Sequence, residues 1–193
     1  MKVACVILTQ TEKQRIEDCL KVIHPHVDWL LVLDGESTDG TVEIAEKYAN
    51  KVEVKHFSGS FAEEKNHART LVPKDCDWII WADADERFDD GFLGKMKEFI
   101  EEGEKKGGIC FRLPRVNLPD GKNFPDYQVR LFKNSRDIEW RGKVHEVPYY
   151  VPYGCPLDQL DNPKWGKRAA VMTVLKYPII HLPRREDERR GWW

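Results

Sequence analysis

Residues 78–85 read WIIWADAD, an apolar run that ends in two aspartates separated by one alanine. A continuous apolar run of this length is typical of a strand covered on both faces of a parallel sheet. Residues 3–8 and 29–33 are runs of the same kind, and residues 52–56 alternate as a further strand. Apolar spacing predicts helices at residues 11–23, 41–49, 62–71 and 91–104, the first starting with a capping box at residues 11–14. Strands that alternate with helices build a parallel sheet.

The pattern changes after Gly107 and Gly108, where the segments become short and alternating. They predict strands at residues 109–113, 129–133, 138–140, 144–147 and 171–180, and a long loop, a candidate lid, at residues 154–167. We therefore predict an α/β fold, an open and mostly parallel sheet flanked by helices, with a smaller mixed or antiparallel C-terminal extension. Residues 1–193 are expected to form a single domain with two halves, 1–106 and 107–193.

Composition and charge exclude several classes of protein. The chain has 193 residues, 41% hydrophobic and 33% charged, so it can bury a core and is neither disordered nor a disulfide miniprotein. Its formal net charge is -2, whereas a protein that binds nucleic acid by neutralising phosphates is normally basic. General nucleic-acid binding is therefore disfavoured.

Cysteine spacing and the length of the apolar runs bear on the compartment. The five cysteines include no C-x-x-C pair, which favours reduced, buried thiols and gives no zinc site. No apolar run approaches the roughly 20 residues that span a bilayer, and the N-terminal run is too short for a signal peptide. We therefore expect a cytoplasmic protein.

Polar side chains follow each predicted strand of the first half. Thr9, Asp34 and His56 end the first three strands, and Asp83 and Asp85 follow the fourth. Ligands of open parallel sheets bind beyond the carboxyl ends of the strands, so these side chains mark the expected site. The sequence has no G-x-x-x-x-G-K-[ST] and no G-x-G-x-x-G after the first strand, which excludes P-loop NTPases and dinucleotide-binding proteins.

Asp83 and Asp85 are the sharpest feature of that site. In an extended chain such residues point to the same side, and Ala84 between them takes little room. Two carboxylates about 4 Å apart repel by roughly 4 kcal/mol at an effective dielectric constant near 20, so one is protonated or a cation lies between them. An oxygen-only pair suits Mg²⁺ or Mn²⁺. The alternative is that these acids, with Glu86, Asp89 and Asp90, only cap the next helix and solvate a loop.

Six segments, in their order and spacing, carry a resemblance to a known family. They are residues 3–8 with 16–20, VLDGESTDGT at 32–41, FAEEKNHA at 61–68, WIIWADADE at 78–86, VRLFK at 129–133 and RGKVHE at 141–146. With these segments the chain resembles the family 2 glycosyltransferases of the GT-A fold, which transfer sugars from nucleotide-sugar donors. The resemblance implies that residues 1–106 bind the nucleotide-sugar and that residues 107–193 form the acceptor and catalytic half.

The resemblance also implies roles for single residues toward the donor. Thr9 and Asp34 would meet the nucleobase, and Lys65 would approach the nucleotide, which we expect to be that of a UDP-sugar. Asp83, beside Ala84, would face the ribose and the metal.

The implied cofactor is a divalent cation, Mn²⁺ or Mg²⁺. Asp85 would ligate it directly together with Asp83, and His181, after a late apolar segment, is the kind of histidine that GT-A enzymes add as a further ligand. The departing nucleoside diphosphate must be stabilised, which a metal does as a Lewis acid. Cationic side chains that could assist are Arg130, Arg184 and Arg185.

Transfer also needs a group that takes the proton of the acceptor hydroxyl. Glu146, which follows His145, is our candidate for this base in an inverting reaction. The acceptor is expected to be a glycan, a lipid-linked molecule or a protein. The tail with Trp192 and Trp193 allows a peripheral membrane contact.

Structural alternatives and two other functions stay open. His145 and Glu146 can be a surface pair, His181 a core or edge histidine, and Lys65 a solvated lysine on a helix. A sugar nucleotidyltransferase is a second function, although residues 9–14 lack the glycine-rich loop that it needs. A non-catalytic nucleotide-sugar-binding module is a third.

Overall fold

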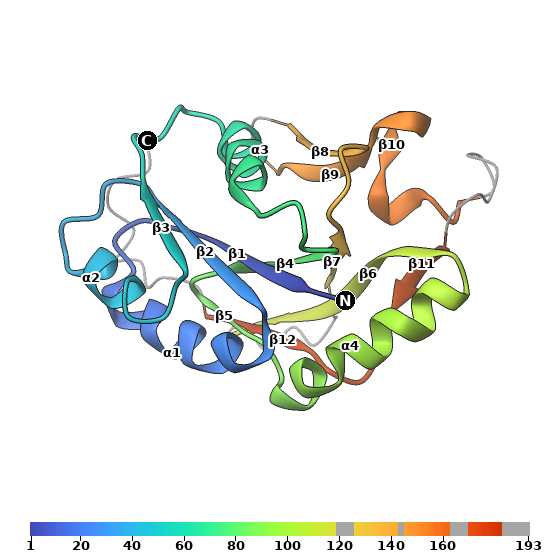
Figure 1. The fold of residues 1–193 in the computed structure, drawn as a ribbon, viewed down its shortest axis with the longest axis horizontal. Helices are drawn as coiled ribbons and strands as arrows, with labels where there is room; N and C mark the ends of the chain where they lie inside the picture. Colours follow the sequence, from blue (N-terminus) through green and yellow to red (C-terminus); the bar gives the residue numbers. More distant parts are fainter. Residues whose placement is uncertain (119–125, 143–144, 163–169, 183–193) are drawn as a thin grey trace.

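A computed structural model describes residues 1–118, 126–142, 145–162 and 170–182 (Figure 1). Within these ranges, nine strands form one sheet and three more form a small second sheet. Helices α1, α2 and α4 cover one face of the large sheet, whereas α3 and the small sheet cover the other (Figure 1). No helix in the described part of the chain is long and apolar enough to cross a membrane.

The first half of the chain alternates strand and helix as predicted. Its strands β1 (Val3–Thr9), β2 (Trp29–Asp34), β3 (Lys51–Val54) and β4 (Trp78–Asp83) are parallel and lie in the order β3-β2-β1-β4. Its helices are α1 (Lys13–Ile23), α2 (Thr41–Ala45), α3 (Phe61–Leu71) and α4 (Asp90–Lys105), with a 3₁₀ turn at His24–His26. The predicted helix at residues 41–49 was too long, because α2 ends at Ala45 and a turn follows.

The second half completes the same sheet with mixed strand directions. Its strands there are β6 (Gly108–Asn117), β7 (Asp126–Lys133), β11 (Ala170–Thr173) and β12 (Ile179–His181), and the short strand β5 (Glu86–Arg87) of the first half pairs with β12. β7 lies between β4 and β6 and is antiparallel to both, whereas β12 is parallel to β6. The predicted mostly parallel sheet with a mixed extension is therefore confirmed.

The small sheet is antiparallel and packs near α3. It consists of β8 (Ile138–Arg141), β9 (Val147–Tyr150) and β10 (Cys155–Pro156), with 3₁₀ turns at Val151–Tyr153 and Leu157–Gln159. The predicted long loop at residues 154–167 was thus wrong for its first part, and residues 163–167 lie outside the described ranges. The predicted strand at residues 171–180 is two strands, β11 and β12.

The apolar strands are buried on both faces, as their sequence predicts. In β1, Val3, Cys5 and Ile7 pack toward α1 and α4, whereas Ala4 and Val6 pack toward α3. All five cysteines are free and buried, which confirms the prediction of reduced core thiols.

Helix α1 begins differently from the prediction. The expected capping box at residues 11–14 was wrong, because the loop after β2 supplies the caps. Glu12 N donates to Thr41 Oγ1 at 2.9 Å, and Lys13 N donates to Asp39 Oδ2 at 3.1 Å. Thr11 has a left-handed backbone, with φ 55°, which is uncommon for a β-branched residue. The loops after β1 and β2 therefore hold each other in place.

Candidate functional site

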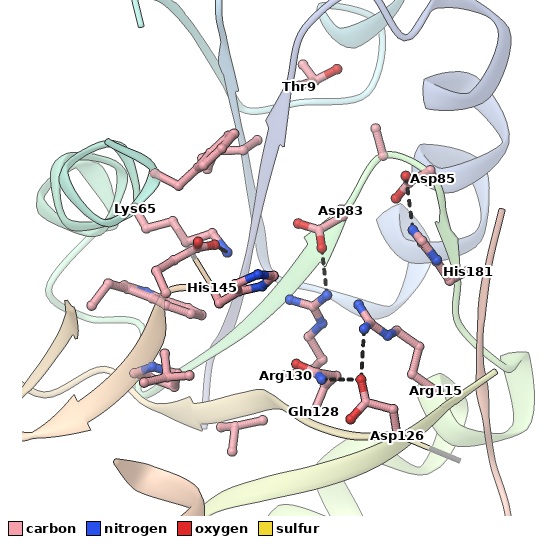
Figure 2. Close-up of a pocket in the computed structure, with 18 of the residues that line it drawn as sticks. Thr9, Lys65, Asp83, Asp85, Arg115, Asp126, Gln128, Arg130, His145 and His181 are labelled. Atoms are coloured by element: carbon pink, nitrogen blue, oxygen red, sulfur yellow. Dashed lines mark hydrogen bonds and ion pairs between the residues drawn. The ribbon is translucent and has the colours of Figure 1, made fainter. Parts of the chain in front are cut away.

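A cavity of about 830 Å³ lies beyond the carboxyl ends of β1 and β4 (Figure 2). Its wall also includes α3, β7, β12 and residues 145–148. The predicted site residues that line it are Thr9, Lys65, Asp83, Ala84, Asp85, Arg130, His145, Glu146 and His181. Arg184 and Arg185 lie outside the described ranges. The topological rule that pointed to this edge of the sheet therefore brings nearly all the predicted residues to one cavity.

Asp34 lines a small neighbouring cavity of about 30 Å³. This cavity shares Leu8, Thr9 and Phe61 with the large one. The Asp34 carboxylate accepts hydrogen bonds from Ser37 N at 2.7 Å and from Ser37 Oγ at 2.6 Å. Burial raises the pKa of Asp34 in spite of these two hydrogen bonds.

Thr9 lies where the two cavities meet. The residue is only 4% exposed, and its Oγ1 has no hydrogen-bond partner among the described residues. A buried hydroxyl without a partner costs free energy, and a ligand that spans the two cavities would supply one.

Asp83 is held by a buried arginine. Its Oδ2 accepts a hydrogen bond from Arg130 Nη2 at 2.6 Å (Figure 2). The same nitrogen donates to Glu86, which is fully buried. Burial alone would raise the pKa of Asp83, but the charges of Arg130 and Lys65 outweigh it and lower the pKa to about 2. Asp83 is therefore an ionised side chain with one oxygen already engaged.

Arg130 acts on the protein's own carboxylates. Burial lowers the pKa of its guanidinium, but Asp83 and Glu86 outweigh this and raise it above its ordinary value. Next to it, Arg115 Nη2 contacts Asp126 Oδ2 at 2.8 Å, and Gln128 Nε2 donates to the same oxygen at 2.6 Å (Figure 2). Glu86 belongs to this network rather than to a solvated loop.

Asp85 meets a different partner from Asp83, because Ala84 and Asp85 form a turn rather than extended chain. The expectation of an extended chain from Asp83 to Asp85 is therefore wrong, although both side chains line the same cavity. Asp85 Oδ2 faces His181 Nε2 at 3.3 Å (Figure 2). The backbone supports this pairing, since Leu182 N donates to Asp85 O at 2.8 Å. His181 thus contacts a predicted ligand from the short strand β12, which lies between β6 and β5.

The donor set of Asp85 and His181 fits a divalent cation. His181 Nδ1 lies 2.7 Å from Asn117 Oδ1, and in the neutral tautomer with its proton on Nδ1 the lone pair of Nε2 faces the Asp85 carboxylate. Two facing acceptors at this distance favour a cation between them, and oxygen with imidazole nitrogen suits Mn²⁺ or Mg²⁺. Among the described residues, no three His, Cys, Asp or Glu side chains form a metal-binding group. Water and the phosphates of a substrate are groups that could supply further ligands.

Lys65 and Glu146 form an ion pair in the cavity wall. Lys65 Nζ lies 2.6 Å from Glu146 Oε1, and it also lies 4.3 Å from the centre of the Trp140 ring. Lys65 is 5% exposed, so the alternative of a solvated helix lysine is wrong. His145, the residue before the acid, has a left-handed backbone with φ 57°.

The comparison with known families decides the relationship. A model of glycosyl transferase family 2 matches residues 5–159. The chain belongs to this family. The expected resemblance is therefore confirmed.

Two relatives show how much of a longer protein the chain matches. An uncharacterized glycosyltransferase of Rickettsia felis is 40% identical over 187 residues, covering 82% of this chain and 65% of that protein. The SPbeta prophage-derived glycosyltransferase SunS of Bacillus subtilis is 27% identical over 164 residues, covering 84% of this chain and 38% of that protein. The family 2 chain thus spans between about two fifths and two thirds of the length of these relatives.

A solved structure confirms the GT-A fold of this family 2 chain. Glucosyl-3-phosphoglycerate synthase from Mycobacterium tuberculosis, in complex with Mn²⁺ and uridine-diphosphate-glucose, superposes with a TM-score of 0.63 at 17% sequence identity. The match covers 97% of this chain and 73% of the other.

Several residues of the family 2 site escape sequence reasoning. Arg115, Asp126, Asn117 and Trp140 line the cavity or support its side chains, and Glu86 joins the Arg130 network. In the sequence, Glu86 is the third acid of the run that begins with Asp83. Its partner Arg130 lies 44 residues away along the chain, so no local pattern links the two.

Proposed function

We propose that this family 2 chain is a metal-dependent glycosyltransferase. It would transfer a sugar from a UDP-sugar to an acceptor hydroxyl, with inversion at the sugar carbon. The observation that carries this proposal is the facing pair of Asp85 and His181, 3.3 Å apart, in a cavity that also holds a carboxylate suited to act as a base.

The donor would occupy both cavities. The unpartnered hydroxyl of Thr9 and the carboxylate of Asp34 lie at the smaller one, which suits a nucleobase. Asp83, kept ionised by Arg130, would accept hydrogen bonds from the ribose hydroxyls with its second oxygen. The likeness to a structure that contains uridine-diphosphate-glucose supports a uridine nucleotide.

The charges of the described cavity wall support metal dependence. Its three Lys and Arg side chains are each paired with an acid: Lys65 with Glu146 at 2.6 Å, Arg115 with Asp126 at 2.8 Å and Arg130 with Asp83 at 2.6 Å. A diphosphate therefore meets no uncompensated Lys or Arg on this part of the wall. A divalent cation, when bound by Asp85 and His181, would neutralise the diphosphate and act as a Lewis acid.

Glu146 would act as the base. Its carboxylate takes the proton of the acceptor hydroxyl while that oxygen forms a bond to the sugar carbon. The bond from that carbon to the phosphate oxygen breaks, and the nucleoside diphosphate leaves with the electron pair. The acceptor would be a hydroxyl of a glycan, or of a lipid-linked or protein substrate.

A thermal-shift screen of nucleoside diphosphates, each with Mn²⁺ and with a chelator, tests the donor and the metal together. We expect UDP with Mn²⁺ to stabilise the protein by ~2.7 kcal/mol at a hundredfold excess over Kd, and the chelator to remove the shift. No shift with any nucleotide would contradict the proposal.

Two activity assays separate the other functions. Pyrophosphate release from a nucleoside triphosphate and a sugar phosphate would indicate a nucleotidyltransferase. Binding of UDP-sugars without hydrolysis or transfer to any acceptor would indicate a binding module.

A further inference from the structure

We infer that Lys65 is a positioning residue for Glu146 rather than a contact to the nucleotide. The inference rests on the proposed function in one respect, namely that Glu146 is the base. The resemblance to family 2 implied an approach of Lys65 to the nucleotide, whereas the geometry of the side chain points to a different role.

The ammonium group of Lys65 is enclosed by protein. Helix α3 buries Lys65 on its inner side, where Nζ lies 4.3 Å from the centre of the Trp140 ring and 5.4 Å from that of Trp81. Aromatic faces attract such a cation and exclude water from it. Glu146 Oε1, at 2.6 Å, approaches the same ammonium group. A phosphate oxygen would have to displace this carboxylate to reach Nζ.

The distance between α3 and the strand before Glu146 is fixed by the neighbour of Lys65. Asn66 Nδ2 donates to Trp140 O at 2.8 Å, and Trp140 N donates to Asn66 Oδ1 at 2.8 Å. These two hydrogen bonds join the helix to β8 through one side chain. Because Trp140 also contacts the ammonium group, Lys65 keeps its place relative to the segment that carries Glu146.

A fixed partner matters for a carboxylate in this position. A glutamate side chain has several rotatable bonds, and a base acts only from within hydrogen-bond reach of the proton that it takes. The contact of Oε1 with Lys65 restrains these rotations and sets the direction of Oε2. Lys65 therefore prepares Glu146 for the acceptor without touching the substrate.

The test is a double-mutant cycle with Lys65→Met and Glu146→Gln. Methionine keeps most of the stem of Lys65 between the two tryptophans and removes the charge. We expect Lys65→Met to lower kcat by about ten- to a hundredfold, a part of what a general base contributes, while the Kd of UDP with Mn²⁺ changes less than about twofold. In the Glu146→Gln background the same substitution should change kcat by less than about twofold, because Lys65 acts through Glu146. Lys65→Arg should restore part of the lost activity.

Lys133→Met is the matched control. Lys133 also lies over a tryptophan, 5.8 Å from the centre of the Trp78 ring, and pairs with Glu104 at 3.0 Å, but it does not line the cavity. This variant should keep the kcat of the parent protein.

The outcomes separate this inference from the proposed function. A tenfold or greater loss of UDP affinity in Lys65→Met would make Lys65 a nucleotide contact and overturn the inference. Independent, additive effects of the two substitutions on kcat would also overturn it. If the parent protein transfers no sugar, the proposed function fails, and urea unfolding of the four proteins still decides on the pair. Coupled effects of the two substitutions on the unfolding free energy would support the Lys65–Glu146 pair, and additive effects would overturn it.

Discussion

Asp83 and Asp85 lie at the end of the same strand, with one residue between them, yet they have different surroundings. Asp83 faces β7, where Arg130 joins it to the buried Glu86. Asp85 turns toward β12, where His181 faces it and Asn117 holds the far side of the ring. The turn at Ala84 separates these two regions, which we call the arginine side and the histidine side.

The difference shows how one acidic motif can serve two purposes. On the arginine side every described acid has a cationic partner. The charges therefore compensate one another and stabilise the packing of β4 against β7. On the histidine side the partner of Asp85 is an imidazole, which in its neutral form supplies no charge, so a bound cation would compensate the carboxylate. Both sides begin with an aspartate of the same short motif. The strand that faces each aspartate, β7 or β12, decides its role.

The largest effect is expected on the histidine side. Asp85→Asn keeps the size of the side chain but weakens the proposed cation site, and a cation that supplies several kcal/mol of leaving-group stabilisation accounts for a loss of roughly a thousandfold in kcat. Steady-state transfer assays with Mn²⁺ measure this loss. Circular dichroism and thermal melting should match those of the parent protein. Normal turnover in the variant would refute the metal assignment.

On the arginine side the main effect should be on stability. Arg130→Met leaves Asp83 and Glu86 without their common partner, and breaking a buried ion pair in this way costs about 3–5 kcal/mol. The control is Arg115→Met, because Arg115 pairs at 2.8 Å with the exposed Asp126 and reaches the buried Glu86 only at 4.0 Å. Exposed pairs contribute about 1 kcal/mol or less. Urea unfolding measures both. Equal losses in the two variants would contradict the distinction between the two arginines.

A smaller effect, on metal affinity, is expected from a substitution of Asn117, which contacts His181 Nδ1. Asn117→Ala removes the acceptor of Nδ1, and changes of this kind typically cost about 10- to 100-fold in metal affinity. The Mn²⁺ concentration for half-maximal thermal stabilisation in saturating UDP should rise accordingly. Gln128→Ala, which removes a side chain from the arginine side, should leave that concentration unchanged. A rise in both variants would show that the two sides are not independent.

The smallest effect concerns pH. The pKa of Asp83 falls from its ordinary 3.8 to about 2 because of Arg130 and Lys65, in spite of burial. This ionised carboxylate therefore stabilises the fold above about pH 4, and its contribution is lost as the pH falls toward 2. Glu86 has the opposite sign: burial raises its pKa, so its ionisation costs stability as the pH rises.

Asp83→Asn should remove the contribution of Asp83 to this pH dependence. Urea unfolding at pH 5 and pH 2.5 should give a difference that is smaller in the variant by about 1 kcal/mol. We expect less than the full linkage value, because 35% of the Asp83 side chain is exposed and water screens its charge. An unchanged or larger difference in the variant would show that Arg130 does not hold Asp83 ionised.

The sequence predicts the first half of the fold well, because its signals are local. Runs such as residues 29–33 are apolar throughout and short, which is typical of a strand buried on both faces. The place of Thr9, Asp83 and Asp85 at one edge follows from the parallel direction of the strands. The length of α2 escaped prediction, because apolar spacing continues past Ala45 into a turn.

The partners of the site residues were beyond reach of the sequence. Arg130 reaches Glu86 only because β7 enters the sheet between β4 and β6, and a pairing over 44 residues has no local signature. Lys65 meets Glu146 because Asn66 attaches α3 to β8, which is again a contact between distant segments. Local chemistry selects the residues that meet at the cavity, and tertiary contacts decide what each of them does.

The position of β7 has a consequence for any attempt to divide the molecule. Residues 78–80 of β4 pair with β7, so a fragment that stops after α4 would expose the backbone edge of this apolar segment. Exposed strand edges of this kind pair with strands of other molecules and lead to aggregation. Residues 1–106 are therefore not a module that can be cut out and transplanted, and a fusion or truncation should keep both halves together.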